Sequence, residues 1–234
     1  MEHKRLTLFA GHYGSGKTNI AVNYALALAA EEKKVCIADL DIVNPYFRTK
    51  DSAKELAAAG VDLISPQFAN SNVDLPALPA EAYRLVTDRS SYAIMDIGGD
   101  DRGAYALGRY VPAILEENNY RMVFVANCYR PLTATPEEAM EVMREIEAAC
   151  GLRFTDIVNN SNLGNETTPE TLLRSQDYIA RLSRLSGLPV FATTAVAEVA
   201  AQLPQSFYPV IPLRLQEKYF DLPTQKPGNR PLWG

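Results

Sequence analysis

Short apolar runs alternate with longer helical patterns along most of the chain. The apolar runs are continuous rather than alternating, which is the pattern of strands covered on both faces of a sheet. Predicted strands span residues 5–10, 34–39, 61–65, 92–97, 120–127, 155–160 and 188–193. Predicted helices span residues 18–32, 47–60, 78–88, 135–150 and 168–187. This order predicts an α/β fold with a doubly wound, mostly parallel sheet flanked by helices, because strand–helix alternation produces right-handed crossovers.

The alternation shows no clear linker, internal repeat or low-complexity segment. A length of 234 residues suits one large α/β domain better than two small ones. We therefore predict a single domain over residues 1–234. Its last part, about residues 215–234, is rich in proline and is predicted to be an irregular tail that carries Trp233.

A glycine-rich segment, AGHYGSGKTN at residues 10–19, joins the first predicted strand to the first predicted helix. It satisfies the Walker A pattern G-x-x-x-x-G-K-[ST] in the strand–loop–helix context that this motif requires. Backbone N–H groups of such a loop line a nest for phosphate oxygens, and the helix points its positive end at the same place. Lys17 is predicted to reach the β- and γ-phosphates, and the Thr18 hydroxyl to ligate Mg²⁺. The predicted nucleotide-binding residues of the loop are Gly11, Gly14, Ser15, Gly16, Lys17, Thr18 and Asn19.

Three aspartates lie at or just beyond the carboxyl ends of predicted strands: Asp39 and Asp41 in ADLD, and Asp96 in MDIGGD. Ligands of an open parallel sheet bind at this edge, so we expect the aspartates near the phosphate loop. One of them is predicted to hold Mg²⁺ directly or through water, and another to orient the attacking water. Each aspartate taken alone is equally well explained as a cap or turn residue. Gly98 and Gly99 would bring a backbone N–H group against the γ-phosphate.

Charge and cysteine content remove several classes of function. The net charge is −5 and no long basic run occurs, so nucleic acid is not an expected partner. The three cysteines are far apart, which gives little support to a cysteine-ligated metal and fits a reducing compartment. No apolar stretch approaches the ~20 residues of a transmembrane helix. We expect a cytoplasmic protein with no membrane partner.

In order along the chain, GHYGSGKT, ADLDIVNPY and MDIGGD resemble the MinD/ParA-type branch of the P-loop NTPases. The similarity covers roughly the first 160 residues by eye and implies a three-layer P-loop NTPase sandwich. Asp39 and Asp41 would match its first switch, one helping Mg²⁺ and the other the hydrolytic water. Asp96 would match Walker B, and residues 98–99 the second switch. The resemblance further implies that Asn159 reads the adenine base, with Asn160 as the adjacent alternative.

His12 departs from the family pattern, because many members carry at this place a lysine that reaches the nucleotide of a dimer partner. A histidine carries no permanent charge at pH 7, so cross-activation in a dimer loses support. Arg102, Arg109 and Arg130 are candidate substitutes, although a surface or salt-bridge role is the more ordinary explanation for each. Cross-activation aside, the resemblance still allows a homodimer.

The leading hypothesis is a Mg²⁺-dependent ATPase that acts as a nucleotide switch for an unidentified protein partner. Its predicted catalytic residues are Lys17, Asp39 and Asp41, and its predicted Mg²⁺ site is formed by Thr18, Asp39 and Asp96, partly through water. ATP is favoured over GTP because no Asn-Lys-x-Asp motif for reading guanine occurs. Two alternatives remain open: a small-molecule kinase or ATP-dependent ligase of dethiobiotin-synthetase-like fold, and an ATP sensor that does not hydrolyse its ligand.

Overall fold

The computed structural model describes residues 3–40, 49–64, 80–98, 101–204, 207 and 209–215. Of the predicted features, Asp41, Gly99 and the proline-rich stretch from residue 216 onward, with Trp233, lie outside this part of the chain.

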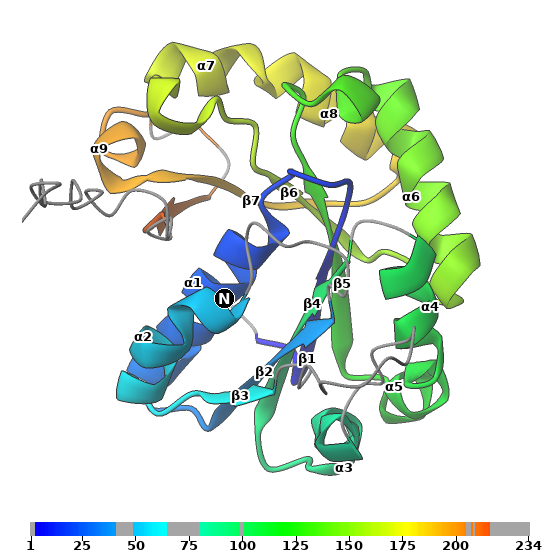
Figure 1. Ribbon diagram of the computed structural model, residues 1–234. Helices are drawn as coiled ribbons and strands as arrows, with labels where there is room; N and C mark the ends of the chain where they lie inside the picture. The colour runs from blue at the N-terminus through cyan, green and yellow to red at the C-terminus, as the bar shows by residue number, and fades with distance from the viewer. Residues whose placement is uncertain are drawn as a thin grey trace, which may run out of the picture.

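Eight described strands form one sheet in the order β3-β2-β4-β1-β5-β6-β7-β8, and every neighbouring pair is parallel (Figure 1). The strands are β1 (Leu6–Ala10), β2 (Val35–Leu40), β3 (Asp62–Ile64), β4 (Tyr92–Ile97), β5 (Tyr120–Ala126), β6 (Asp156–Asn159), β7 (Val190–Val196) and β8 (Val210–Leu213). The predicted doubly wound parallel sheet is confirmed, with all seven predicted strands present and β8 added at its edge.

Nine α-helices connect or flank the described strands. They are α1 (Lys17–Ala30), α2 (Ala53–Ala58), α3 (Arg84–Thr87), α4 (Asp101–Gly108), α5 (Val111–Glu117), α6 (Pro136–Cys150), α7 (Pro169–Arg174), α8 (Gln176–Ser186) and α9 (Ala197–Ala200). Short 3₁₀ turns also occur at η1 (Thr49–Ser52), η2 (Ala80–Tyr83), η3 (Pro131–Thr133) and η4 (Gly164–Glu166).

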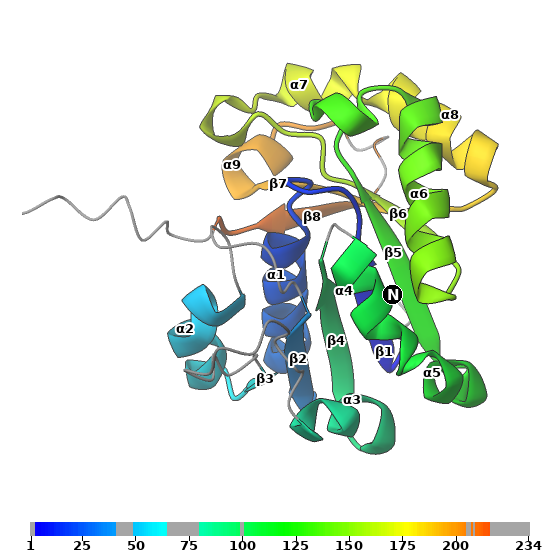
Figure 2. The ribbon, with the colours of Figure 1, turned by 45° about the vertical axis from the view of Figure 1, so that its right-hand side comes forward.

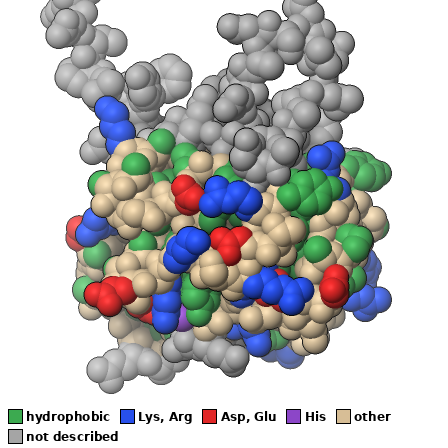
Figure 3. Space-filling view, turned by 90° about the horizontal axis from the view of Figure 1, so that it is seen from below, with side chains coloured by type: hydrophobic (Ala, Val, Ile, Leu, Met, Phe, Trp, Pro, Cys, Tyr) green, Lys and Arg blue, Asp and Glu red, His purple; other side chains and the backbone are tan. Residues whose placement is uncertain are grey.

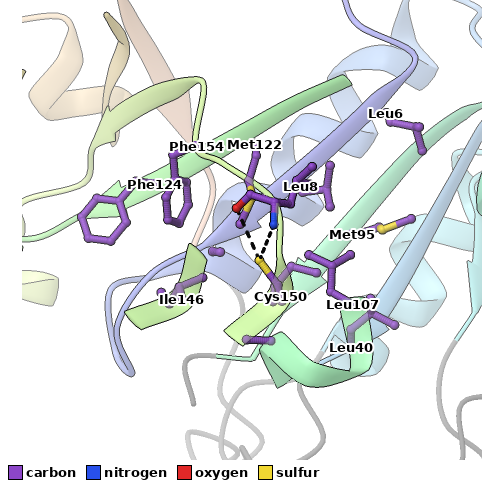
Figure 4. Packing of buried hydrophobic residues seen from close by; sticks show 14 of the residues in the cluster. Leu6, Leu8, Leu40, Met95, Leu107, Met122, Phe124, Ile146, Cys150 and Phe154 are labelled. Carbon is purple, nitrogen blue, oxygen red and sulfur yellow. Dashed lines mark hydrogen bonds between the residues drawn. The ribbon is translucent and has the colours of Figure 1, made fainter. Parts of the chain in front are cut away.

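The two faces of the sheet are covered by different helices, which gives three layers (Figures 1 and 2). α1 and α2 supply the helical part of one buried cluster, with Leu28 and Leu56 among its members. Helices α3 to α6 and α8 pack on the other face, where Leu8, Met95 and Leu107 meet, as Figure 4 shows. Successive strand residues serve opposite faces, so burial on both sides explains why the strands read as continuous apolar runs.

Several predicted helices are shorter or divided. The predicted helix 168–187 is two helices, α7 and α8, divided at Ser175, whose N–H and hydroxyl both donate to the Leu172 backbone oxygen, at 3.0 and 2.8 Å. The predicted helices 47–60 and 78–88 begin as 3₁₀ turns and are α-helical only over α2 and α3. α4, α5 and α9 were not predicted.

The face seen in Figure 3 lies at the end of the molecule that carries α3 and α5, far from α7 and α9. Basic and acidic side chains are interspersed over the described part of this face. Lys34 pairs with Asp88 at 3.3 Å, and Arg84 with Asp62 at 3.0 Å. These solvent-exposed pairs add little to stability.

Candidate nucleotide-binding site

The loop of residues 11–16 lies at the centre of the carboxyl edge of the sheet. It follows β1, which pairs with β4 on one side and β5 on the other. From β1 the chain first moves to β2 and β3 on one side of the sheet, and it then returns through β4 to β5 on the other side, so the strand order reverses at β1. A crevice at such a switch point is where open α/β sheets bind ligands.

Glycines are required at two positions of this loop by close approaches as well as by backbone angles. Gly11 has φ of +152°, and a Cβ atom added to it would lie 2.7 Å from the Val125 backbone oxygen. Gly16 has φ of +93°, and its added Cβ would collide with the amide nitrogen of Asn160. Both positions exclude side chains, so the loop packs against β5 and the end of β6.

Lys17 and Thr18 begin α1 and are both buried. The Lys17 ammonium group donates from Nζ to the His12 backbone oxygen at 3.3 Å, so it lies back along its own loop. Gly16, the N-cap residue, makes no side-chain cap to the helix, and the first turn holds no acidic residue. The first backbone N–H groups of α1 and one buried cation therefore face the space where phosphate oxygens would bind.

Asp39 and Asp96 are neighbours across the β2–β4 ladder, at the carboxyl ends of both strands. Both are buried, and strand alternation places them with Ile37 and Ile94 on the face covered by α1. They therefore lie on the same side of the sheet as the helix that carries Thr18. Sequence reasoning placed both carboxylates at this edge but did not establish that they share a face.

Thr49, in η1, joins these two carboxylates and is fully buried. Its backbone N–H donates to Asp39 Oδ2 at 3.3 Å, and its hydroxyl donates to Asp96 Oδ2 at 3.2 Å. Sequence reasoning missed this residue, because a threonine ten positions after Asp39 matches no motif. The one sequence feature that could have drawn attention to Thr49 is its position shortly after the Asp-x-Asp pair.

The donor set at this edge fits Mg²⁺. Two carboxylates and a threonine hydroxyl supply hard oxygen ligands, and Mg²⁺ is usually bound through one or two carboxylates together with waters and substrate phosphates. Among the described residues no group of three or more His, Cys, Asp and Glu side chains could hold a metal alone. A Mg²⁺ site in which the protein supplies some oxygen ligands and a bound nucleotide supplies the others agrees with the donor set and with the lack of a protein-only cluster among the described residues.

The two asparagines at the end of β6 point to opposite faces of the sheet. Asn160 donates from Nδ2 to the Ser15 backbone oxygen at 2.6 Å and accepts from the Thr194 hydroxyl at 2.6 Å. Asn159 is fully buried; it donates to Ser175 Oγ at 2.8 Å and accepts from the Ser161 N–H at 3.2 Å. Of the pair, Asn160 is the one in contact with the phosphate loop. Base reading by Asn159 would require its present hydrogen bonds to be exchanged, and that role stays a prediction.

The connection from β5 to α6 also reaches the phosphate loop. Its last residue, Thr135, caps α6 through a capping box with Glu138, as an ordinary strand–helix connection would. Earlier in the same connection, the Arg130 side chain lies against Gly14. The other candidate cations are elsewhere or undescribed: Arg109 is exposed at the α4–α5 turn beside Tyr110, and the side chain of Arg102 lies outside the described part.

A Walker A loop between β1 and α1, with two carboxylates at the ends of β2 and β4, defines a P-loop nucleotide-binding domain. The sequence model of the CobQ/CobB/MinD/ParA nucleotide-binding domain matches residues 6–167, more than half of the chain. The chain belongs to this family. The resemblance in the three motifs is thereby confirmed, whereas a search of curated proteins gives no match.

Solved structures agree on the fold. FtsY of Thermotoga maritima, described as a cell division protein, has a TM-score of 0.52 and 16% identity over 81% of this chain and 60% of that one. The signal recognition particle receptor FtsY of Elizabethkingia anophelis has a TM-score of 0.51 and 15% identity over 81% and 58%. Chloroplast FtsY of Physcomitrella patens has a TM-score of 0.52 and 16% identity over 81% and 58%. The chain thus spans about 60% of the length of these structures, and at such identities the likeness concerns the fold alone.

In the described part of the chain, no helix combines the length and the apolar character needed to cross a bilayer.

Proposed function

We propose that this chain is a Mg²⁺-dependent ATPase whose nucleotide state controls binding to a protein partner. The observation that carries the proposal is the arrangement of two buried carboxylates, joined by Thr49, on the α1 side of the sheet beside the Walker A loop. A phosphate-binding loop alone would account for nucleotide binding without hydrolysis. Two carboxylates beside the loop can bind a metal ion and orient an attacking water, as hydrolysis requires.

In this proposal the loop binds the phosphate chain of ATP. The amides of residues 14–19 and the ammonium group of Lys17 neutralise the phosphates, and the Lys17 side chain exchanges its bond with His12 for a phosphate oxygen. Gly98 is buried just beyond β4, and its N–H is a proposed donor to the terminal phosphate; Gly99, proposed for the same role, lies outside the described residues.

Thr18, Asp39 and Asp96 would hold Mg²⁺, partly through water. When bound, the ion would neutralise part of the charge that develops on the phosphate oxygens. Asp39 and Asp41 are the proposed residues that orient the attacking water or accept its proton. Thr49 fixes the angle between the Asp39 and Asp96 carboxylates, because it bonds one oxygen of each.

ATP is the proposed nucleotide because the sequence carries no Asn-Lys-x-Asp motif. Residues 159–162, which follow this edge of the sheet, read Asn-Asn-Ser-Asn and offer amides rather than the carboxylate that pairs with guanine. The structural neighbours do not decide the base, since they agree in fold only.

Exposed apolar side chains at the same edge support a protein partner. Tyr13 in the phosphate loop is 51% exposed, Leu132 in η3 is 58% exposed, and Leu163 before η4 is 47% exposed. All three lie in loops after β1, β5 and β6, where a nucleotide would change the surroundings. Their position on loops that a bound nucleotide would contact is the reason for proposing this edge as the partner surface, and a second copy of the chain is one proposed partner.

The test is phosphate release from ATP and from GTP with Mg²⁺, for the native chain, Lys17→Ala and Asp96→Asn. We expect release from ATP, with a rate that falls about a hundredfold or more in both variants, since each removes charge stabilisation from the transition state. Arg144→Ala is the matched control, because Arg144 is exposed on the outer side of α6.

The alternatives give different results. Binding of an ATP analogue without turnover would contradict hydrolysis and favour the sensor. Turnover that begins only when a small metabolite is added would favour the kinase or ligase. Failure to bind any nucleoside triphosphate would refute the proposal.

A further inference from the structure

Arg130 occupies a turn whose backbone is fixed on both sides. Its N–H donates to the Asn127 backbone oxygen at 3.2 Å, and its own oxygen accepts from the Thr133 N–H at 3.0 Å. The Thr133 hydroxyl also donates to the Asn127 backbone oxygen, at 2.8 Å. Next to it, the Tyr129 hydroxyl donates to the Thr171 oxygen at 2.7 Å, which ties the turn to α7. The base of the Arg130 side chain is therefore held in place, although the side chain is exposed.

The guanidinium end of Arg130 lies against the phosphate loop. A Cβ atom added to Gly14 would lie 3.5 Å from Arg130 Nε and 3.6 Å from its Cζ, and its three nearest neighbours all belong to this one side chain. Gly14 itself is exposed, so Arg130 covers the loop from the solvent side. Lys17 approaches the same loop from within.

The charge of Arg130 is not balanced by a carboxylate in the described part of the chain. Other arginines there form ion pairs: Arg121 lies 3.2 Å from Asp156, and Arg84 lies 3.0 Å from Asp62. No described residue forms a hydrogen bond or ion pair with the Arg130 guanidinium group. A second group at this turn also lacks a described partner, since Asn127 is fully buried and its Nδ2 makes no hydrogen bond among these residues.

We propose that Arg130 is a phosphate-contacting residue, a second cation supplied by the same chain to the phosphates bound in the loop of residues 11–16. The inference rests on the proposed function and deepens it. Because His12 brings no permanent charge, Arg130 supplies the positive charge on the outer side of the loop. A guanidinium group donates two parallel bonds to one phosphate, which an ammonium group cannot do. The same contact stabilises negative charge on the phosphate oxygens during hydrolysis.

The test compares Arg130→Ala, Arg130→Lys and the control Arg144→Ala in the full chain. Affinities are measured for ATPγS and ADP with Mg²⁺ at two salt concentrations, together with ATP hydrolysis. We expect Arg130→Ala to weaken ATPγS binding roughly ten- to a hundredfold, which is typical for loss of a charge-assisted bond. Its binding should also depend less on salt than that of the native chain. Arg130→Lys should recover only part of the affinity, and Arg144→Ala should match the native chain.

The outcomes separate this inference from the proposed function. If the native chain binds and hydrolyses ATP and Arg130→Ala does the same within twofold, Arg130 makes no phosphate contact and the proposed function stands. If the native chain binds without hydrolysis, the affinities alone decide the inference. If the native chain binds no nucleotide, both are refuted. Unfolding midpoints of the variants should equal the native value, since the Arg130 side chain makes no hydrogen bond or ion pair with the described residues.

Discussion

Asn160 Nδ2 donates to the backbone oxygen of Ser15 across 2.6 Å and so ties the end of β6 to the middle of the phosphate loop. The other end of the same amide accepts from the Thr194 hydroxyl, also at 2.6 Å, which adds a link to β7. Asn160 is only 6% exposed, so both bonds are protected from water. The loop is therefore held by the sheet on its far side as well as by β1 and α1.

Replacing Asn160 by alanine should loosen the phosphate loop. The Ser15 backbone oxygen and the Thr194 hydroxyl would lose their partner, and a buried polar group left unsatisfied costs about 1–3 kcal/mol. We expect the free energy of unfolding to fall by an amount in that range. Nucleotide affinity should fall as well, because the loop amides are no longer preorganised. Urea unfolding and ATPγS binding measure the two effects, with Asn165→Ala, exposed in η4, as control. Equal affinity in Asn160→Ala and the control would show that the link to Ser15 does not order the loop.

Thr49→Ala should impair use of Mg²⁺ more than it impairs folding. The variant keeps the backbone bond to Asp39 but removes the hydroxyl that donates to Asp96. Groups that orient metal-binding carboxylates change metal affinity or activity about ten- to a hundredfold when lost, so the Mg²⁺ concentration at half-maximal hydrolysis should rise by about tenfold. Thr49→Ser retains the hydroxyl and should behave like the native chain. A Mg²⁺ titration that is the same for all three proteins would refute the role.

Sequence reasoning was strongest where burial imposes a pattern. Continuous apolar runs predicted seven of the strands and their parallel arrangement, because a strand covered on both faces leaves little room for polar residues. It failed where elements are short. β8 has four residues and includes Pro212, and α9 also has four residues. Both are too short for a repeating pattern of apolar and polar residues to be recognised. α4, with a glycine at its third position, gave no helical signal either.

The site divides in the same way. The Walker A loop was predictable because its local conformation requires glycines and a lysine at fixed spacing in the sequence. Asp39 and Asp96 were predictable as an edge pair from their places at strand ends. Asn160 and Arg130 were named from the sequence only as alternatives, and Thr49 was not named, because all three meet the loop or the carboxylates only through the tertiary fold. Alternation along β6 continues through Ile157 and Val158, which lie in opposite clusters, and it places Asn160, rather than Asn159, on the side of the loop.

Gly11→Ala and Gly60→Ala should show how much a steric conflict adds to backbone strain, because both glycines have positive φ but only Gly11 has a close neighbour. Gly60, just beyond α2, has φ of +73° and no atom within 4 Å of an added Cβ. Its substitution should cost only about 1 kcal/mol, the strain of a left-handed residue. Gly11 has a backbone oxygen 2.7 Å from its added Cβ, so its substitution must move the loop or β5 and should cost about 2–3 kcal/mol. Only Gly11→Ala should also lose ATPγS binding; unfolding and binding measurements that find the two variants alike would contradict this account.

Glu117→Leu should destabilise the chain strongly and leave the nucleotide site intact. Glu117 forms an ion pair with Arg5, and both side chains are 8% exposed. Arg5 also donates from Nη1 to the backbone oxygens of Leu85 and Ser91, at 3.0 and 3.2 Å. Removing Glu117 leaves the buried Arg5 guanidinium group without its carboxylate partner, so we expect the free energy of unfolding in urea to fall by about 3–5 kcal/mol.

The double variant Arg5→Met with Glu117→Leu should be less destabilised than the sum of its single changes. It removes the unpaired charge, although the backbone oxygens of Leu85, Asp88 and Ser91 lose the Arg5 donor, at about 1–3 kcal/mol for each one left unsatisfied. A double-mutant cycle measures the coupling, which we expect to exceed about 1 kcal/mol. ATPγS affinity of each folded variant should equal the native value, because Arg5 precedes β1 at the edge of the sheet opposite to Gly11. Strictly additive losses would show that the pair is solvated and contributes as two independent surface charges.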